Sequence, residues 1–163
     1  MKGLMQDWPL LVHTFIDHAS LHHGDREIVT RKVEGDIHRT NYSEIHSRAR
    51  KFSKSLIKLG VKKSDVIGTL AWNTHRHLET WYGITGVGAI YHTLNPRLFL
   101  EQLEYIINHA DNKYIIADIT FVKILEGIEA KLPNVKGFIF LTDSANMPET
   151  NLKNIFCYED MLK

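Results

Sequence analysis

The sequence predicts a doubly wound α/β domain, in which a mostly parallel sheet carries helices on both faces, preceded by a helix and a small β-hairpin. Short apolar runs alternate with amphipathic segments over residues 66–141. The run Val66–Trp72 is almost continuously apolar, as expected for a strand that is covered on both faces. Right-handed crossovers between parallel strands then place helices on both sides of the sheet.

The amino-terminal part of the chain predicts a helix followed by a hairpin. Apolar residues recur at helical spacing over residues 10–23, and Gly24 is a natural helix stop. Glu27–Lys32 and Ile37–Thr40 flank a short glycine-containing segment, which is typical of a β-hairpin. These elements make up the first region that we expect, residues 1–41.

A long helix opens the expected α/β core, residues 42–141. Asn41, with Glu44 three residues later, resembles a capping box, and apolar residues then recur at steps of four and three as far as Leu59. The opposite face of this helix carries Arg48, Arg50, Lys51, Lys54 and Lys58. We interpret it as a solvated face rather than a surface for a phosphate-bearing partner, because no aromatic residue interleaves the charges.

Strands and helices alternate through the rest of the core. The predicted strands are Val66–Trp72, Ala89–Leu94, Tyr114–Ala117 and Gly137–Leu141. The predicted helices between them are His77–Val87, Leu100–His109 and Phe121–Leu132. Beyond the last strand the composition turns polar, so residues 142–163 are expected to form a surface loop and the truncated start of a further element, read as a helix near Glu159.

Composition is that of an ordinary globular protein, with 44% hydrophobic and 24% charged residues, which excludes disorder. The 20 Lys and Arg nearly balance the 19 Asp and Glu, so composition gives no reason to expect nucleic acid or an acidic membrane as a partner. The chain shows no signal peptide and no transmembrane segment, and its single cysteine fits a reducing compartment. We therefore expect a cytoplasmic protein.

Two local motifs are interpreted as structural. Gly83, Gly86 and Gly88 are spaced G-x-x-G-x-G at a helix end, whereas a dinucleotide fingerprint needs G-x-G-x-x-G between a strand and the following helix. We predict that these glycines allow close packing of the helix against the sheet. His18 and His22 lie four residues apart, but no third metal ligand is fixed by the sequence, so no metal site is expected.

Polar residues that follow the predicted parallel strands form the candidate ligand crevice. In open α/β sheets, ligands bind outside the carboxyl ends of the strands. The candidates there are Asn73, His77, Asn95 and Arg97. Asn73 is equally a candidate for capping the next helix, and Asp118, after the third strand, is predicted to be a cap.

Several ordered segments resemble one protein family. They are Trp72–Glu79, Gly88–Leu98 and Tyr105–Asp111, preceded by Arg39–Glu44 and Arg48–Arg50. Together they closely resemble the adenylate-forming acyl-CoA synthetases, particularly the medium- and long-chain fatty-acid–CoA ligases. The resemblance runs over nearly the whole chain, and the ordered set is far more specific than any single motif.

The resemblance implies a two-step reaction in the complete enzyme. A carboxylate attacks the α-phosphate of ATP to give an acyl-adenylate and pyrophosphate, and the thiol of CoA then displaces AMP. Fatty acid, ATP, Mg²⁺ and CoA are therefore the expected ligands of such an enzyme. The family's phosphate loop, which ends in Pro-Lys-Gly, and its later catalytic segments have no counterpart in these 163 residues, so no catalytic, cofactor-binding or metal-binding residue is assigned.

We accordingly expect residues 1–163 to be an incomplete N-terminal subdomain that is inactive alone and needs the missing remainder of the ligase. The alternative is a stand-alone binding or oligomerisation module without catalysis. The residues that would dock on another subunit are Met5, Trp8, Leu10 and Leu11. An uncovered sheet edge also predicts self-association, for example as a homodimer.

Two positions carry further expectations. The family usually places a small polar residue where Phe99 and Leu100 stand, so the helix that begins there is expected to lack its usual N-cap or to be fixed by packing of Phe99. Trp81 and Tyr82 are interpreted as core aromatics, with one wall of an acyl tunnel as the alternative.

Overall fold

The computed structural model describes residues 3–4 and 6–163, so Met5 lies outside the described residues. Its centre is a five-stranded, fully parallel sheet in the order β4-β3-β5-β6-β7. The strands are β3 (Val66–Leu70), β4 (Ile90–Thr93), β5 (Asn112–Ala117), β6 (Phe138–Phe140) and β7 (Ile155–Cys157). The predicted fold class is confirmed. Only β7 was not predicted, because its three residues lie where the expected loop ends and the expected terminal element begins.

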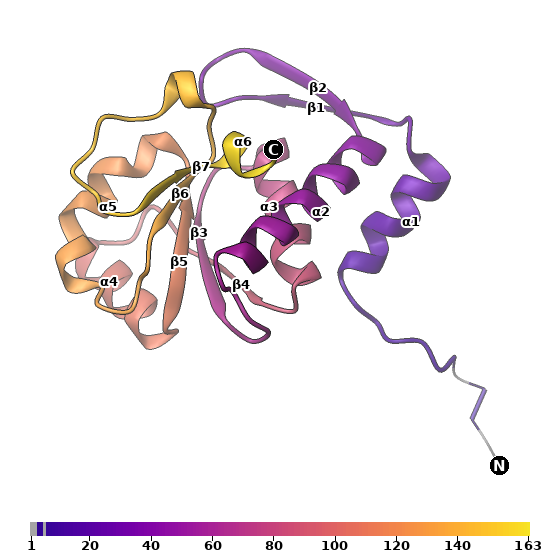
Figure 1. Ribbon diagram of the computed structural model, residues 1–163, viewed down its shortest axis with the longest axis horizontal. Helices are drawn as coiled ribbons and strands as arrows, with labels where there is room; N and C mark the ends of the chain where they lie inside the picture. Colours follow the sequence, from indigo (N-terminus) through magenta and orange to yellow (C-terminus); the bar gives the residue numbers. More distant parts are fainter. Residues whose placement is uncertain (1–2, 5) are drawn as a thin grey trace.

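Helices cover both faces of the sheet (Figure 1). One face carries α2 (Tyr42–Lys58), α3 (His75–Gly86) and the short α6 (Tyr158–Met161), and the other carries α4 (Leu100–His109) and α5 (Val122–Ile128). The chain leaves β3 for β4 on one side and later returns to β5 on the other. The carboxyl ends of β3 and β5 therefore form the topological switch point, where open α/β sheets commonly place a ligand crevice.

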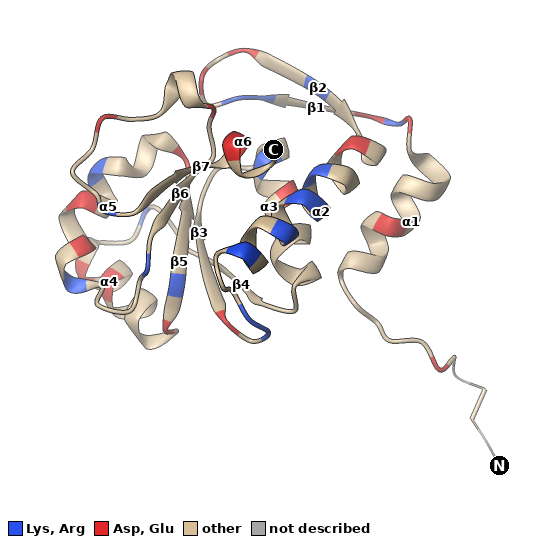
Figure 2. Cartoon of the chain, viewed as in Figure 1, with Lys and Arg blue, Asp and Glu red and all other residues tan. Residues whose placement is uncertain are grey.

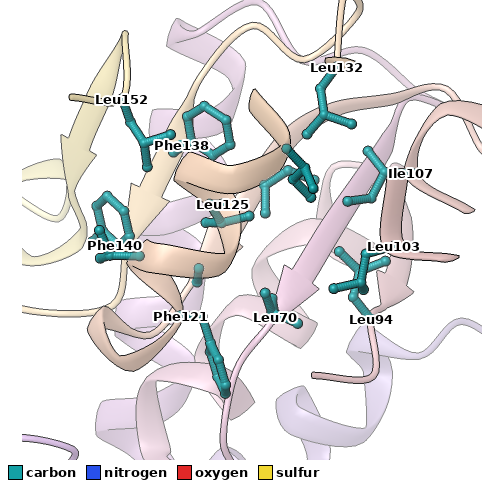
Figure 3. Close-up of a cluster of buried hydrophobic side chains, with 14 residues drawn as sticks. Leu70, Leu94, Leu103, Ile107, Phe121, Leu125, Leu132, Phe138, Phe140 and Leu152 are labelled. Atoms are coloured by element: carbon teal, nitrogen blue, oxygen red, sulfur yellow. The ribbon is translucent and has the colours of Figure 1, made fainter. Parts of the chain in front are cut away.

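Each face of the sheet has its own apolar core. The cluster under α4 and α5 includes Leu70, Leu103, Ile107, Leu125 and Phe140, all at most 1% exposed (Figure 3). The cluster under α2 and α3 includes Phe52, Leu56, Ile67, Ile84 and Ile116, all fully buried. Neighbouring residues of one strand point to opposite faces, so β6, which contributes to both clusters, is apolar at every position.

The elements that precede the sheet are α1 (His13–His23), β1 (Glu27–Arg31) and β2 (Ile37–Asn41). The strands β1 and β2 pair antiparallel, as the hairpin prediction requires. Asn41 caps α2 through a hydrogen bond from the Glu44 backbone N–H, at 2.9 Å. The Glu44 carboxylate accepts from the Thr40 hydroxyl instead of completing the capping box. No helix in the described part of the chain is long and apolar enough to cross a membrane.

The glycines at the end of α3 allow close packing, but their partner is α2 rather than the sheet. A Cβ on Gly83 would lie 2.7 Å from Cδ1 of Phe52, and one on Gly86 would lie 3.1 Å from Oγ of Ser53. Gly88 has a φ of +77° in the turn after the helix. The predicted packing against the sheet is therefore wrong, and these glycines let two helices approach each other.

Helix α4 begins without a cap from its N-cap residue, as predicted. The Phe99 side chain offers no hydrogen-bond acceptor, and at 76% exposure it is not held by packing. The Gln102 side chain instead accepts from the Phe99 backbone N–H at 3.1 Å. One unpaired donor of the first turn is thus satisfied from inside the helix.

Candidate functional site

The main candidate site is a pocket of about 490 Å³ at the carboxyl ends of β3 and β4. The hairpin strand β1, the first turns of α3 and strand β4 enclose it. Its ring and amide side chains are Asn73, His75, His77, Trp81 and Tyr91. Ile28 and Leu78 add apolar surface. No carboxylate, lysine or arginine lines the pocket within the described part of the chain, so it suits an uncharged, largely apolar group.

Two of the predicted crevice residues, Asn73 and His77, lie together at this pocket. Asn95 and Arg97 do not line it. They are exposed in the loop after β4, where the Asn95 side-chain oxygen accepts the Arg97 backbone N–H at 3.0 Å. The cap of α3 is Thr74, whose hydroxyl accepts the His77 N–H at 3.4 Å. Capping by Asn73 is therefore wrong, whereas its contact with a ligand stays a prediction.

His77 is held in place by a tyrosine. Its Nε2 is hydrogen-bonded to the Tyr91 hydroxyl. Burial lowers the pKa of His77, so the ring is neutral at neutral pH. The Trp81 ring lies 6.5 Å from the Tyr91 ring and 5.1 Å from that of Tyr82. Trp81 is 39% exposed and Tyr82 only half-buried, so the predicted core role of this pair is wrong.

A second histidine forms the deeper wall of the pocket. His75 is 3% exposed, and its ring stacks on that of His38 from β2 with the centroids 4.0 Å apart. Burial, together with the nearby His38 and Arg76, lowers the pKa of His75 to about 3. The His75 ring is therefore neutral near pH 7.

At the switch point itself, Asp118, Trp72 and Thr120 are hydrogen-bonded to one another. Asp118, which follows β5, accepts the Trp72 backbone N–H at 2.6 Å, so the helix cap predicted for it does not form. The Trp72 indole N–H donates to the Thr120 hydroxyl at 3.1 Å. Burial raises the pKa of Asp118 to about 6, and its hydrogen bond from Trp72 offsets only part of this effect. The open pocket is accordingly displaced from this point toward β4.

Beside the switch point lies a buried network of charges that sequence reasoning missed. Arg76 donates to Glu34 in the hairpin turn at 2.7 Å and to Glu159 in α6 at 2.9 Å. Arg48 donates to Glu79 at 2.8 Å and to the same Glu159 at 2.9 Å. The Arg48 side chain is only 21% exposed. Its assignment to a solvated basic face is therefore wrong.

The charges compensate one another inside the network. Burial raises the pKa of Glu79, which accepts hydrogen bonds from Arg48 and from the Tyr158 hydroxyl at 2.7 Å. At Glu34, burial acts in the same direction, but hydrogen bonds from its own backbone, Arg76 and Thr142 outweigh it and lower the pKa. The paired residues lie 31 to 111 positions apart, so no local pattern could have joined them.

Residues 3–4 and 6–163 form no metal-ligand cluster and no nucleotide-phosphate loop. His18 and His22 have ring centroids 4.5 Å apart, but no cluster of three or more His, Cys, Asp or Glu side chains occurs among the residues that the structure describes. The glycines near α3 serve helix packing. The described residues therefore assemble neither a carboxylate cluster of the kind that holds Mg²⁺ nor a glycine-rich loop of the kind that holds nucleotide phosphates.

Fold and pocket together define the chain as an open α/β domain whose candidate ligand site lies at the carboxyl ends of its strands. The AMP-binding enzyme family matches residues 16–156. The chain belongs to this family, which confirms the resemblance seen in its ordered segments.

Curated relatives match nearly the whole chain. It is 38% identical to a medium-chain-fatty-acid–CoA ligase of Ectopseudomonas oleovorans over 162 residues, 99% of this chain and 30% of the relative. It is 37% identical to a long-chain-fatty-acid–CoA ligase of Thermus thermophilus, over 97% of this chain and 28% of the relative. A 3-methylmercaptopropionyl-CoA ligase of Ruegeria lacuscaerulensis is 47% identical over 86% of the chain and 26% of the relative.

Solved structures share the fold at low sequence identity. An anthranilate CoA ligase in complex with anthranoyl-AMP superposes with a TM-score of 0.80 at 19% identity, over 97% of this chain and 29% of that one. Coronafacic acid ligase from Pectobacterium brasiliense gives a TM-score of 0.78 at 18% identity, over 94% and 29%. The chain thus spans about 30% of the length of the first curated relative it matches.

Proposed function

We propose that these 163 residues are the amino-terminal structural part of an AMP-forming fatty-acid–CoA ligase. The observation that carries this proposal is the family match over residues 16–156. The two fatty-acid–CoA ligases at 38% and 37% identity support the substrate class, a fatty acid of medium or long chain.

The proposed reaction activates a carboxylate in two steps. A carboxylate oxygen of the fatty acid attacks the α-phosphorus of ATP, the bond from that phosphorus to the bridging oxygen breaks, and pyrophosphate leaves. The sulfur of CoA then attacks the acyl carbonyl carbon and AMP leaves with the C–O bonding pair. The first step is needed because a carboxylate is a poor acyl donor until one of its oxygens belongs to a good leaving group.

The described residues supply scaffold and pocket wall in this proposal. Since they form neither a metal-ligand cluster nor a nucleotide-phosphate loop, we place the binding of ATP, Mg²⁺ and CoA in the remainder of the ligase and expect no tight binding here. The neutral pocket with Asn73, His77 and Trp81 supports a contact with an apolar part of a ligand. Asn95 and Arg97 are proposed only as residues of the neighbouring loop.

A domain transplant tests the proposal. Residues 16–156 replace the matching segment of the Thermus thermophilus long-chain ligase, and pyrophosphate release is measured with a long-chain fatty acid, ATP, Mg²⁺ and CoA. We expect the chimera to turn over, with the parent ligase as the positive control. The 163-residue chain alone is expected to release no pyrophosphate above the no-enzyme control.

Each arm of this experiment can contradict a separate claim. A chimera that melts cooperatively by circular dichroism but releases no pyrophosphate would show that the segment does not serve as a ligase scaffold. Turnover by the isolated chain would overturn the expectation that it is inactive alone. The alternative, a stand-alone module, predicts a folded segment that gives no active chimera.

Location and self-association are separate proposals. The single Cys157 supports a cytoplasmic location, because a lone cysteine forms no disulfide within its own chain. Homodimer formation is supported by β7, which pairs with β6 on one side and with no further strand in the described part of the chain. Sedimentation velocity over a range of protein concentrations tests it, and a strictly monomeric profile would contradict it.

A further inference from the structure

The exposed face of α2 carries cations that form no ion pair with any described residue. They are Arg50, Lys51, Lys54 and Lys58, here called the basic face. Figure 2 shows several blue segments along α2, among which Arg48 is also coloured. Lys62 and Lys63 follow in the turn after the helix. Arg48 on the same helix differs from them, because it points into the buried network. The basic face is thus a surface feature that fold stability does not explain.

Two adjoining hollows follow the basic face. They have volumes of about 410 and 320 Å³ and share His46, Arg50 and Lys54 in their linings. The larger hollow lies between α1 and α2, and Ile57 and Tyr82 add apolar surface to it. Its one carboxylate, Asp17, lies 2.8 Å from Nε2 of His46. The result is a groove with a cationic rim and a partly apolar wall.

An exposed apolar segment reaches this groove from the amino-terminal side. Trp8 is 65% exposed, Leu10 96%, Leu11 45% and Phe15 71%, and Ile57 on α2 is 59% exposed. His13, which lies within this segment, lines the larger hollow. Tryptophan and leucine next to clustered lysine and arginine are the combination that binds the headgroup boundary of membranes.

We propose that the basic face of α2 and the segment Trp8–Phe15 form a docking surface for an anionic phospholipid membrane. Arg50 and Lys54 contact lipid phosphates, while Trp8 and Leu11 enter the boundary between headgroups and acyl chains. The whole-chain charge of +1 hides this local asymmetry, which composition alone does not reveal. The exposed leucines and phenylalanine beside the cations favour a membrane over nucleic acid, because aliphatic side chains have no partner on a nucleic acid. The proposal is independent of the ligase assignment.

Vesicle sedimentation with the full chain tests the proposal. We expect binding to phosphatidylcholine vesicles that contain about one-third phosphatidylglycerol, and little binding to pure phosphatidylcholine. The double variant Arg50→Gln, Lys54→Gln is expected to bind about 25-fold more weakly, since each cation near an anionic surface contributes about fivefold. The control, Lys123→Gln with Lys153→Gln, removes the same net charge from α5 and from the loop before β7, and its binding is expected to stay within about twofold.

Tryptophan fluorescence tests the role of the apolar segment Trp8–Phe15 separately. On adding anionic vesicles, tryptophan emission is expected to shift to shorter wavelength, and the variant Trp8→Phe is expected to abolish the shift although Trp72 and Trp81 remain. Leu11→Ala is expected to weaken vesicle binding without changing the thermal unfolding midpoint.

Several results would overturn the proposal. Equal binding to neutral and anionic vesicles would show that the basic face does not bind the membrane. An equal loss of vesicle binding in the α2 variant and in the control variant would show that only net charge matters. Binding to single-stranded DNA that survives Leu11→Ala, with no vesicle binding, would assign the surface to nucleic acid. Vesicle-independent dimerisation that Trp8→Phe or Leu11→Ala abolishes would assign it to a second copy of the chain.

Discussion

Three titratable side chains lie beside the carboxyl ends of the strands: Asp118 and His75 are buried, and His77 is half-buried. In each case burial is the main cause of the pKa shift, upward for the carboxyl group and downward for the imidazoles. All three therefore favour their uncharged forms more than they would in water. At the residue scale, this end of the sheet is a weakly charged environment next to a network in which two arginines bind three glutamates.

The raised pKa of Asp118 predicts a specific pH dependence of stability. The pKa of Asp118 rises from 3.8 to about 6 on folding. The stabilisation that its protonated carboxyl group contributes to the free energy of unfolding is therefore fully present below about pH 4 and is lost as the pH rises through 6. The loss amounts to roughly 3 kcal/mol. Asp118→Asn keeps an acceptor for the Trp72 N–H but does not titrate. Urea unfolding from about pH 4 to pH 7 should show the variant gaining stability relative to the wild type by this amount; a constant difference would contradict the assignment.

At the scale of elements, the close approach of α2 and α3 positions the pocket. Gly83 brings the two helix backbones together, and the Ser53 hydroxyl donates to the Gly83 carbonyl at 2.7 Å. The opposite end of α3 carries His75 and His77 to the pocket. The spacing of the helices therefore affects both the core and the candidate site.

Two glycine-to-alanine changes should have opposite effects. Gly83→Ala places a Cβ 2.7 Å from Phe52 and 3.1 Å from the Ala49 carbonyl oxygen, so the free energy of unfolding should fall by about 1–2 kcal/mol despite better helix propensity. In Gly127→Ala, in α5, the new Cβ would contact only Leu100, at 3.5 Å, so this change should raise the free energy of unfolding by about 0.5–1 kcal/mol. Thermal and urea unfolding measure both. Equal effects at the two sites would show that packing against α2 is not tight.

At the scale of the whole molecule, the buried network joins segments that no single element connects. Glu34 from the hairpin turn, Arg48 from α2, Arg76 and Glu79 from α3, and Glu159 from α6 meet behind the strand ends. The ion pair between Glu34 and Arg76 therefore attaches the hairpin to the α/β core in addition to apolar contacts. Because β1 forms one side of the pocket, this pair also helps to keep the pocket closed on that side.

Removing the charge of Glu34 should loosen the hairpin selectively. In Glu34→Gln, Arg76 keeps its bonds to Glu159 and to the Leu141 carbonyl, so the sheet should be unaffected. Amide hydrogen exchange in β1 and β2 should become about tenfold faster, while β3 and β5 stay protected. The matched control is Glu27→Gln in the same hairpin, which breaks an exposed pair with Arg39 and should change exchange little. Equal acceleration in both variants, or in β3, would contradict the role of Glu34.

Much of the fold was predictable, and the misses have physical causes. The strand Val66–Leu70 and the helix Leu100–His109 follow from local apolar patterns, which depend on burial on both faces or on one face. The strand Ile155–Cys157 is too short for such a pattern and exists because β6 offers an edge to pair with. Of the predicted crevice residues, Asn73 and His77 share a pocket because both follow β3, in the loop and in the first turn of α3. Asn95 and Arg97 lie in the loop after β4 and do not reach this pocket.

The sequence by itself determined the α/β class, the order of most elements and the family, because periodicity and ordered motifs are local properties of the chain. The tertiary structure alone decided which charges are buried and which are exposed. Arg48 and Arg50 lie on one helix two positions apart, yet one enters a network of carboxylates and the other faces solvent beside a groove. That difference depends on residues brought together from distant parts of the chain, and only folding brings them into contact.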